Sequence, residues 1–363
     1  MSKKRYFPPE LLNSFLETLP KAVIQKIIGK SINNLPIHLL QMGSGPFKIM
    51  MWSQMHGNET TTTRALIDFI PWFLDADQKL YQKAFKLCII PQLNPDGAKA
   101  YTRLNANKID LNRDAIKLSQ PETKALRFVY DRINPDLCLN LHGQRTIFAA
   151  GPMGATASLS FLAPSADNQR SITKARKEAM CLIATIREEL HHDLPNEVGR
   201  YDDSFNANCV GDSFTQMGTP TILFEAGHVS NDYQREITSK LILKAYKILL
   251  KTLNNQIKKL SVDNYFSIPE NSKDFCDLIL KDVLIYDKGI KKEKQELAIQ
   301  YREILKEGVV EFIPYMLNYG ESLKINAHKT MILPTNLKSK VVYFKKEKNI
   351  NLIEFNALLS LNQ

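Results

Sequence analysis

Four short apolar segments, each followed at once by a polar motif, set the pattern of the first two thirds of the chain. They cover residues 47–52, 85–91, 137–141 and 221–224. Segments this short, apolar at nearly every position, are typical of strands buried on both faces of a largely parallel sheet. The pattern therefore predicts four buried strands, with polar residues where each strand ends.

Segments with helical spacing of apolar residues lie between these strands. They are expected over residues 60–74, 122–133, 172–190 and 235–260, and the run Thr60–Thr63 could cap the first of them. Strands that alternate with helices indicate an α/β fold, with a mostly parallel or mixed central sheet flanked by helices. In open sheets of this kind the ligand crevice lies beyond the carboxyl ends of the strands, which is where the polar motifs fall.

The pattern changes after about residue 260. Residues 261–272 are polar and predict a linker, and residues 278–286, 298–305 and 309–316 predict strands, with a hairpin turn at Lys306–Gly308. Residues 343–352 are polar and rich in lysine. We therefore expect a catalytic domain over residues 1–260 and a small β-rich accessory domain over residues 261–363.

Composition excludes several classes of protein. The chain has 363 residues, 44% hydrophobic and 24% charged, as in ordinary globular proteins. Its net charge of +10 comes from lysines mixed with acids rather than from a basic stripe, so no nucleic-acid partner is expected. No apolar run approaches the roughly 20 residues that span a bilayer, and no secretory signal is expected at the start. The five cysteines form no paired spacing, which favours a reducing cytoplasm.

The most informative motif is His56-Gly57-Asn58-Glu59, directly after the first apolar segment. Imidazole and carboxylate are both zinc ligands, and two histidines with one glutamate leave a position open for water. His142 ends the third apolar segment and is the candidate third ligand. Each could instead be an ordinary buried or helix-start residue, but their joint placement at strand ends favours one Zn²⁺ per chain.

Other polar motifs complete the candidate site: Asn94-Pro95-Asp96-Gly97, Asp110-Leu111-Asn112-Arg113 and Phe224-Glu225-Ala226-Gly227-His228. Glu225 ends an apolar strand without a local partner, where an unpaired carboxylate would be costly. Arg113 offers a planar fork that suits a carboxylate, although an ion pair with Asp114 is the simpler alternative.

These motifs, in this order, resemble the zinc carboxypeptidase family over roughly residues 20–260. The resemblance implies that His56, Glu59 and His142 hold zinc and that Glu225 is the catalytic base. It also implies that Arg103 polarises the scissile carbonyl, that Asn112 and Arg113 bind the substrate's terminal carboxylate, and that Asp110 orients the first histidine. Tyr201, 24 residues before Glu225, matches the family's rim tyrosine in position, although its surroundings diverge.

The expected reaction is hydrolysis of an amide next to a free carboxylate in a short or modified peptide, by water that zinc activates. The related aspartoacylase and succinylglutamate desuccinylase group also has the histidine–glutamate pair and the Asp-Leu-Asn-Arg stretch, so an N-acyl amino acid deacylase is the alternative. A non-catalytic member is disfavoured because candidate ligands, base and clamp are all present. Oligomeric state and side-chain preference stay open.

Overall fold

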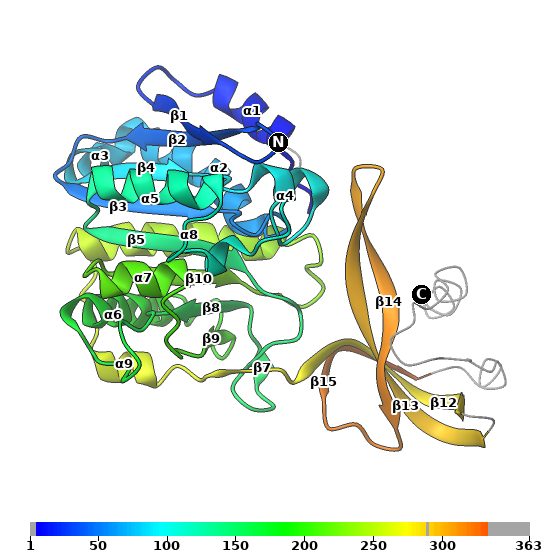
Figure 1. Cartoon of the computed structure of the whole chain (residues 1–363). Helices are drawn as coiled ribbons and strands as arrows, with labels where there is room; N and C mark the ends of the chain where they lie inside the picture. Colours follow the sequence, from blue (N-terminus) through cyan, green and yellow to red (C-terminus); the bar gives the residue numbers. More distant parts are fainter. Residues whose placement is uncertain (1–4, 288–289, 333–363) are drawn as a thin grey trace. The chain divides into compact units, whose positions relative to one another are not determined.

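The computed structural model describes residues 5–287 and 290–332, which form two compact units (Figure 1). The first unit contains residues up to 144 together with residues 157–271, and the second contains residues 145–156 and those from 272 onwards. The segment 145–156 thus leaves the first unit and returns to it, a detour that the sequence pattern did not indicate. The sequence-based boundary at residue 260 stays a prediction.

The first unit is built on a mixed sheet of eight strands in the order β1-β2-β4-β3-β5-β10-β8-β9. Their bounds are β1 Ile24–Lys30, β2 Pro36–Met42, β3 Phe47–Ser53, β4 Phe85–Ile90, β5 Leu137–Gly143, β8 Leu159–Leu162, β9 Val198–Arg200 and β10 Thr221–Ala226. The central strands β4, β3, β5 and β10 run parallel. The pairs β1–β2, β2–β4 and β8–β10 are antiparallel, and β8–β9 is parallel. The four predicted strands are the four central ones, which confirms that part of the pattern.

Helices cover both faces of this sheet (Figure 1). The unit contains α1 Pro9–Glu17, α2 Thr61–Leu74, α3 Lys79–Ala84, α4 Pro95–Ala100, α5 Pro121–Ile133, α6 Lys174–Glu189, α7 Val210–Gln216, α8 Glu236–Leu253 and α9 Val262–Phe266, with 3-10 turns at Ala76–Gln78 and Leu111–Arg113. One hydrophobic cluster joins a sheet face to α2, α6 and α8, and the other joins the opposite face to α5 and α7.

Three local expectations need correction. Thr60 is the N-cap of α2 but makes no side-chain cap bond; its hydroxyl donates to the Arg5 carbonyl at 2.6 Å instead. α8 ends at Leu253 and does not continue to about residue 260. Two residues after Leu253, Asn255 takes a left-handed conformation (φ 58°) that stops the helix. The predicted linker contains α9, and its Tyr265 is fully buried with its hydroxyl accepting from the Ala163 amide at 3.2 Å.

The second unit is β-rich, as expected. Its four-stranded sheet has the order β14-β13-β12-β15, with β12 Phe275–Asp287, β13 Ile290–Lys306, β14 Val309–Gly320 and β15 Asn326–Ile332. The predicted turn at Lys306–Gly308 joins β13 to β14, and Glu307 and Gly308 take the positive φ values that a tight hairpin requires. A smaller sheet joins β6 Ala149–Ala150, β7 Ala155–Thr156 and β11 Asn271–Ser272. Residues 343–352 lie outside the described residues.

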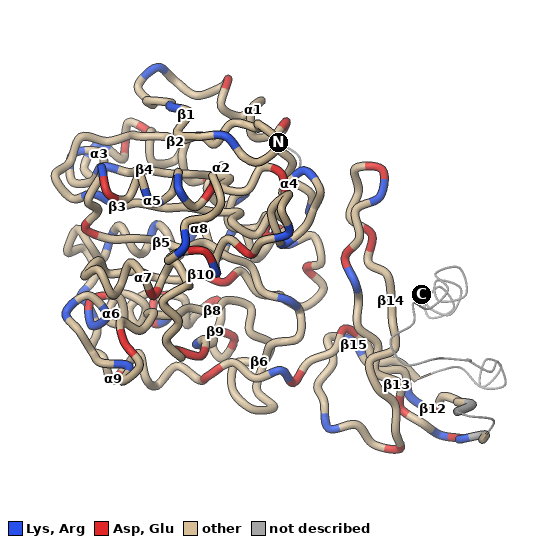
Figure 2. Tube along the Cα trace, viewed as in Figure 1, with Lys and Arg blue, Asp and Glu red and all other residues tan. Residues whose placement is uncertain are grey.

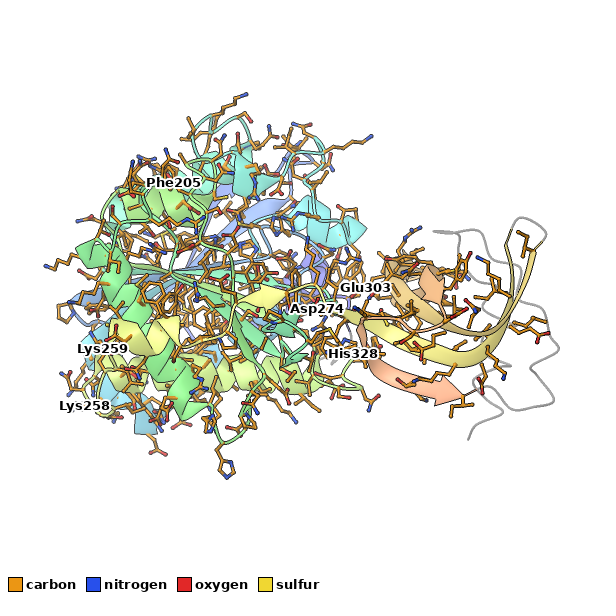
Figure 3. All side chains as sticks on the ribbon, turned by 90° about the horizontal axis from the view of Figure 1, so that it is seen from below. Phe205, Lys258, Lys259, Asp274, Glu303 and His328 are labelled. Atoms are coloured by element: carbon orange, nitrogen blue, oxygen red, sulfur yellow. The ribbon has the colours of Figure 1, made fainter. Side chains whose placement is uncertain are left out.

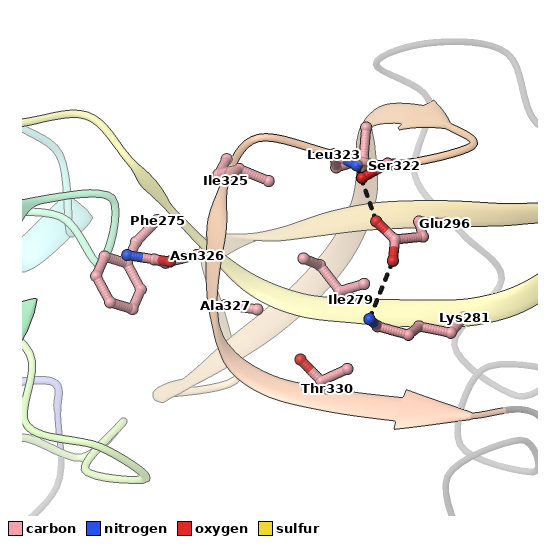
Figure 4. Close-up of a pocket in the computed structure, with 10 residues that line it drawn as sticks. All are labelled: Phe275, Ile279, Lys281, Glu296, Ser322, Leu323, Ile325, Asn326, Ala327 and Thr330. Atoms are coloured by element: carbon pink, nitrogen blue, oxygen red, sulfur yellow. Dashed lines mark hydrogen bonds and ion pairs between the residues drawn. The ribbon is translucent and has the colours of Figure 1, made fainter. Parts of the chain in front are cut away.

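The second unit has polar features that stabilise its own strands. Figure 3 labels His328, whose Nε2 lies 2.7 Å from the Thr146 carbonyl, and Asp274, which accepts from the Met153 amide at 2.8 Å. A pocket of about 540 Å³ opens on this unit (Figure 4). In it the Glu296 carboxylate pairs with Lys281 at 3.1 Å and accepts from the Leu323 amide at 2.8 Å. These contacts are structural ones, because every charge in the pair is already matched.

Charge and thiols follow the expected distribution in the described chain. Lysines and arginines alternate with acids along the trace rather than forming a stripe (Figure 2). All five cysteines are free thiols, and four of them are buried. Among the described residues, no helix is both long enough and apolar enough to cross a membrane.

Candidate metal centre

The predicted ligand residues meet where β3 and β5 end. Asn94 builds this meeting point, because its side chain accepts from the Gly97 amide at 2.8 Å and donates to the Met55 carbonyl at 3.2 Å. The loop carrying His56 packs directly on the Asn94–Gly97 turn, and a Cβ added at Gly57 would lie 1.9 Å from the Gly97 carbonyl carbon. Position 57 therefore requires glycine, because any side chain there would collide with the backbone of the Asn94–Gly97 turn.

His56, Glu59 and His142 converge on one point. Glu59 Oε1 lies 2.8 Å from His56 Nδ1, Glu59 Oε2 lies 2.9 Å from His142 Nδ1, and the two Nδ1 atoms are 3.1 Å apart. One ligand atom from each residue falls within 4.8 Å of the others, so the three could hold one metal ion. Both histidines are buried, and Glu59 is largely so.

The donor set fits Zn²⁺. Two ligand atoms at the usual 2.0–2.1 Å from one tetrahedral zinc lie roughly 3.3 Å apart, close to the separations seen here. Burial by itself raises the pKa of Glu59, but the imidazoles of His56 and His142 outweigh it and hold that pKa below its usual range. A carboxylate that stays ionised between two imidazole nitrogens is what a divalent cation requires.

Asp110 binds the first histidine from behind. Its Oδ1 lies 2.9 Å from His56 Nε2, and because a carboxylate only accepts, that nitrogen carries a proton. Nδ1, which faces the Glu59 carboxylate at 2.8 Å, is therefore the nitrogen that would bind a metal ion, once it carries no proton itself. Asp110 Oδ1 also accepts from the Asn112 amide at 2.9 Å, capping the short 3-10 turn. One carboxylate thus makes both contacts, the cap of the 3-10 turn and the bond to His56.

Arg103 lies beside the same acids and is about half exposed. Its Nε and Nη2 donate to Asp110 Oδ2 at 3.2 and 3.0 Å, and its Nη1 donates to Glu59 Oε1 at 3.3 Å. These bonds use about three of the five N–H groups of a guanidinium, so donors remain for a ligand. The structure therefore brings Arg103 to the metal group, although it lies on an exposed turn.

Glu225 stands next to His142 on the neighbouring strand. The two residues pair in the parallel register of β10 with β5, so their side chains lie on the same face of the sheet. Glu225 Oε2 is buried without a hydrogen-bond partner in the described part of the chain. Burial raises the pKa of Glu225 well above its usual value, the nearby Glu59 carboxylate adds to this, and Arg103 opposes it.

Asn112 and Arg113 extend from the 3-10 turn toward α7. Asn112 Oδ1 accepts from the Val210 amide at 2.9 Å, and Arg113 Nη1 donates to the Asn112 carbonyl at 2.7 Å and to Cys209 Sγ at 3.1 Å. Asp114, the alternative partner of Arg113, is instead bound to Ser119, Gln120 and Thr123. The guanidinium of Arg113 thus stays exposed and is not neutralised by its sequence neighbour.

Tyr201 follows β9, and its amide donates to the Phe161 carbonyl at 3.0 Å. Burial raises the pKa of its hydroxyl well above the usual value, and the carboxylates of Glu225 and Glu59 act in the same direction. The Tyr201 hydroxyl is therefore within electrostatic range of both carboxylates.

Sequence reasoning missed the residues that anchor the segment after this tyrosine. The buried Arg176 on α6 donates to Asp203, to the Arg170 carbonyl and to the Ala163 carbonyl, which ties down the segment after Tyr201. A buried arginine inside an amphipathic helix looks like a surface residue in sequence, so no local signal could have found it.

Comparison with known proteins agrees with this geometry. The family model described as zinc carboxypeptidase matches residues 10–208, more than half of the chain. Carboxypeptidase SOL1 of Arabidopsis thaliana is 31% identical over 137 residues, which are 32% of this chain and 28% of that protein. Carboxypeptidase 2 of Trichophyton tonsurans is 30% identical over 110 residues, 29% of this chain and 20% of that protein. The matches thus span less than a third of these relatives.

Solved structures show the same fold. A metallo-carboxypeptidase from Burkholderia cenocepacia superposes with a TM-score of 0.57 at 16% identity, covering 70% of this chain and 71% of that one. The metallo-carboxypeptidase of Pseudomonas aeruginosa gives 0.57 at 18% identity, covering 69% and 70%. With the matched family model and a converging His-Glu-His group that fits Zn²⁺, the chain belongs to the zinc carboxypeptidase family.

Proposed function

We propose that this protein is a metallocarboxypeptidase that hydrolyses the amide next to a free carboxylate in a short or modified peptide. The observation that carries the proposal is the pairing of Glu225 with His142 across β10 and β5. It sets beside the metal group a buried carboxylate whose Oε2 has no hydrogen-bond partner among the described residues. Zn²⁺, when bound by His56, Glu59 and His142, supplies Lewis-acid activation of water and of the scissile carbonyl. The remaining steps fall to residues of the chain.

Glu225 is proposed as the proton carrier. Its Oε2 takes the proton of the attacking water and passes it to the leaving amine, as a general base and then a general acid. Burial supports this role, because a carboxylate whose pKa is raised holds a transferred proton more readily than an exposed one.

The two arginines are proposed to act at different ends of the scissile residue. Arg103 lies next to Glu59 and has free donors, so it would stabilise charge on the carbonyl oxygen, a role worth about 3–4 kcal/mol per donor. Arg113 is exposed beside α7 and would bind the terminal carboxylate in a two-pronged contact, with Asn112 fixing the turn that carries it. Tyr201 would lie at the rim of the site, since the Glu225 carboxylate contributes to the raised pKa of its hydroxyl.

Glu225→Gln tests the proposal. The amide keeps the shape of the side chain but cannot carry the proton, so we expect full zinc content and a loss of at least about 100-fold in kcat. Glu236→Gln, at the partly exposed start of α8, is the control for a lost carboxylate. Unchanged turnover in Glu225→Gln contradicts the mechanism. Release of acyl groups from N-acyl amino acids, with none from C-terminally free peptides, would assign the chain to the deacylase class instead.

The compartment is also a proposal. Five free thiols, four of them buried, favour a reducing compartment such as the cytoplasm. Fractionation of the native host with antibody detection tests this, and recovery outside the cytoplasm contradicts it.

A further inference from the structure

Two buried polar side chains next to the metal group make no hydrogen bond to any residue that the structure describes. Trp52 on β3 and Asn140 on β5 are register neighbours, and their side chains share one face of the sheet. They are 0% and 1% exposed. The indole Nε1 of Trp52 and both amide atoms of Asn140 make no hydrogen bond to any residue in the described chain.

This pair lies on the same face as the proposed machinery. Asn140 precedes His142 by two residues, a separation of about 6.6 Å along a strand. His142 Nε2 and Glu225 Oε2 are also buried without partners among the described residues. Trp52, Asn140, His142 and Glu225, each with a polar atom that has no hydrogen-bond partner among the described residues, thus lie on one face of three adjacent strands, β3, β5 and β10.

Helix α7 covers the pair from the other side. Phe214 of α7 packs edge-on against Trp52, with ring centroids 5.4 Å apart, and a Cβ added at Gly211 would lie 3.7 Å from Asn140 Nδ2. The start of α7 is also the element that Asn112 holds through the Val210 amide. Asn140 therefore lies against the start of α7, which the Asn112 side chain ties to the turn that carries Arg113.

Leaving these groups unmatched is expensive. A buried amide or indole N–H without a partner costs free energy that an apolar residue of the same shape would not. Satisfied buried polar groups are the rule in folded proteins, so an unmatched pair beside the metal group indicates a partner outside the described residues, such as a bound ligand or a buried water.

We propose that Asn140 and Trp52 form a side-chain subsite that selects substrates whose C-terminal residue carries a neutral hydrogen-bonding group, above all a carboxamide. This inference rests on the proposed carboxypeptidase function. The chemistry of the pair is complementary to a carboxamide: Asn140 Oδ1 accepts from its NH₂, while Asn140 Nδ2 and Trp52 Nε1 donate to its oxygen. Both residues are neutral, so a charged side chain would be buried there without a counter-ion from either.

The test compares two peptides of nearly the same shape. N-benzoyl-Gly-Gln and N-benzoyl-Gly-Met end in side chains of similar length, but only glutamine can pair with the subsite. For the zinc-loaded full chain we expect kcat/KM for the glutamine peptide to exceed that for the methionine peptide by at least about 100-fold, because a site built to hydrogen-bond strongly rejects an analogue that cannot. Asn140→Leu should reduce this ratio to below about tenfold, chiefly through the glutamine peptide, and Trp52→Phe should reduce it in part.

A second readout does not depend on turnover. Free L-glutamine, the product, should raise the thermal unfolding midpoint of the wild type more than L-methionine does, and Asn140→Leu should abolish that difference. Without ligand, Asn140→Leu should unfold at the same temperature as the wild type or higher, since leucine removes the unmatched amide. Leu223→Asn on the next strand is the control for added polarity on the same face.

The outcomes separate the two proposals. Equal kcat/KM values for the two peptides overturn the subsite. An Asn140→Leu protein that is less stable than the wild type and equally selective also overturns it, because the Asn140 amide is then hydrogen-bonded to buried water. Cleavage of neither peptide, with glutamine still stabilising the protein through Asn140, refutes the proposed function and keeps the subsite. No cleavage and no Asn140-dependent stabilisation overturn both.

Discussion

Removing the Arg176 guanidinium should destabilise the first unit more than any other single change to an ion pair in the described chain. Arg176 lies on α6 with 1% of its side chain exposed and donates to Asp203 and to the carbonyls of Ala163 and Arg170. Arg176→Met keeps the helix and most of the volume but removes every one of these bonds. The Asp203 carboxylate, only 11% exposed, then loses its buried partner.

The size of the destabilisation depends on the contacts that Asp203 keeps after Arg176 is replaced. Breaking a buried ion pair from one side costs about 3–5 kcal/mol, because the other charge stays buried. Arg170 still contacts Asp203 at 2.9 Å, but its side chain is half exposed, so it compensates only in part. We therefore expect a loss near the lower limit, about 3 kcal/mol, which corresponds to a fall of about 6–12 °C in Tm for a domain of this size.

Tryptophan fluorescence in urea is the assay that isolates this unit. The only two tryptophans, Trp52 and Trp72, both lie in the first unit. Arg187→Met is the matched control: it makes the same substitution on the same helix, where Arg187 pairs with the exposed Glu188 at 3.1 Å. That pair should contribute less than about 1 kcal/mol.

A double-mutant cycle completes the test. Asp203→Asn alone should also destabilise the protein, and the two changes together should cost less than their sum by about 1–3 kcal/mol, since they share one interaction. If Arg176→Met behaves like Arg187→Met, or if the two effects simply add, the buried pair does not hold the segment after Tyr201 and the reasoning fails.

Three further outcomes are expected. Burial raises the pKa of Asp212 to about 6 from 3.8, so its ionisation destabilises the folded state as pH rises through this window. Asp212→Asn should therefore raise the free energy of unfolding by about 1–3 kcal/mol at pH 8 and leave it unchanged at pH 3. An increase that does not depend on pH in urea titrations contradicts this. Asp110→Asn should weaken zinc binding by about 10–100-fold in competition with a coloured chelator, because it loosens His56; a change under threefold removes that role. Arg113→Lys keeps the charge but loses the planar fork, so KM should rise roughly tenfold with little change in kcat, and an unchanged KM argues against a carboxylate clamp.

The sequence by itself determined the elements with strong local signals. The four apolar segments became the parallel centre of the sheet because residues apolar on both sides have no stable position except between two helical layers. The ends of those strands placed His56, His142 and Glu225 at one edge, since parallel strands share the direction in which they finish. The turn at Lys306–Gly308 was likewise readable, because a hairpin selects residues that tolerate positive φ.

Tertiary structure decided what depends on residues distant in the chain. The packing of Gly57 on Gly97, the proton on His56 that Asp110 fixes, and the exposure of Arg113 despite Asp114 all arise from segments that meet only after folding. The pairing of Trp52 with Asn140 and the burial of Arg176 are of the same kind. Apolar periodicity reports which face of an element is buried, but it carries no information on which buried polar group finds a partner, because that partner is chosen by the fold and not by its neighbours in sequence.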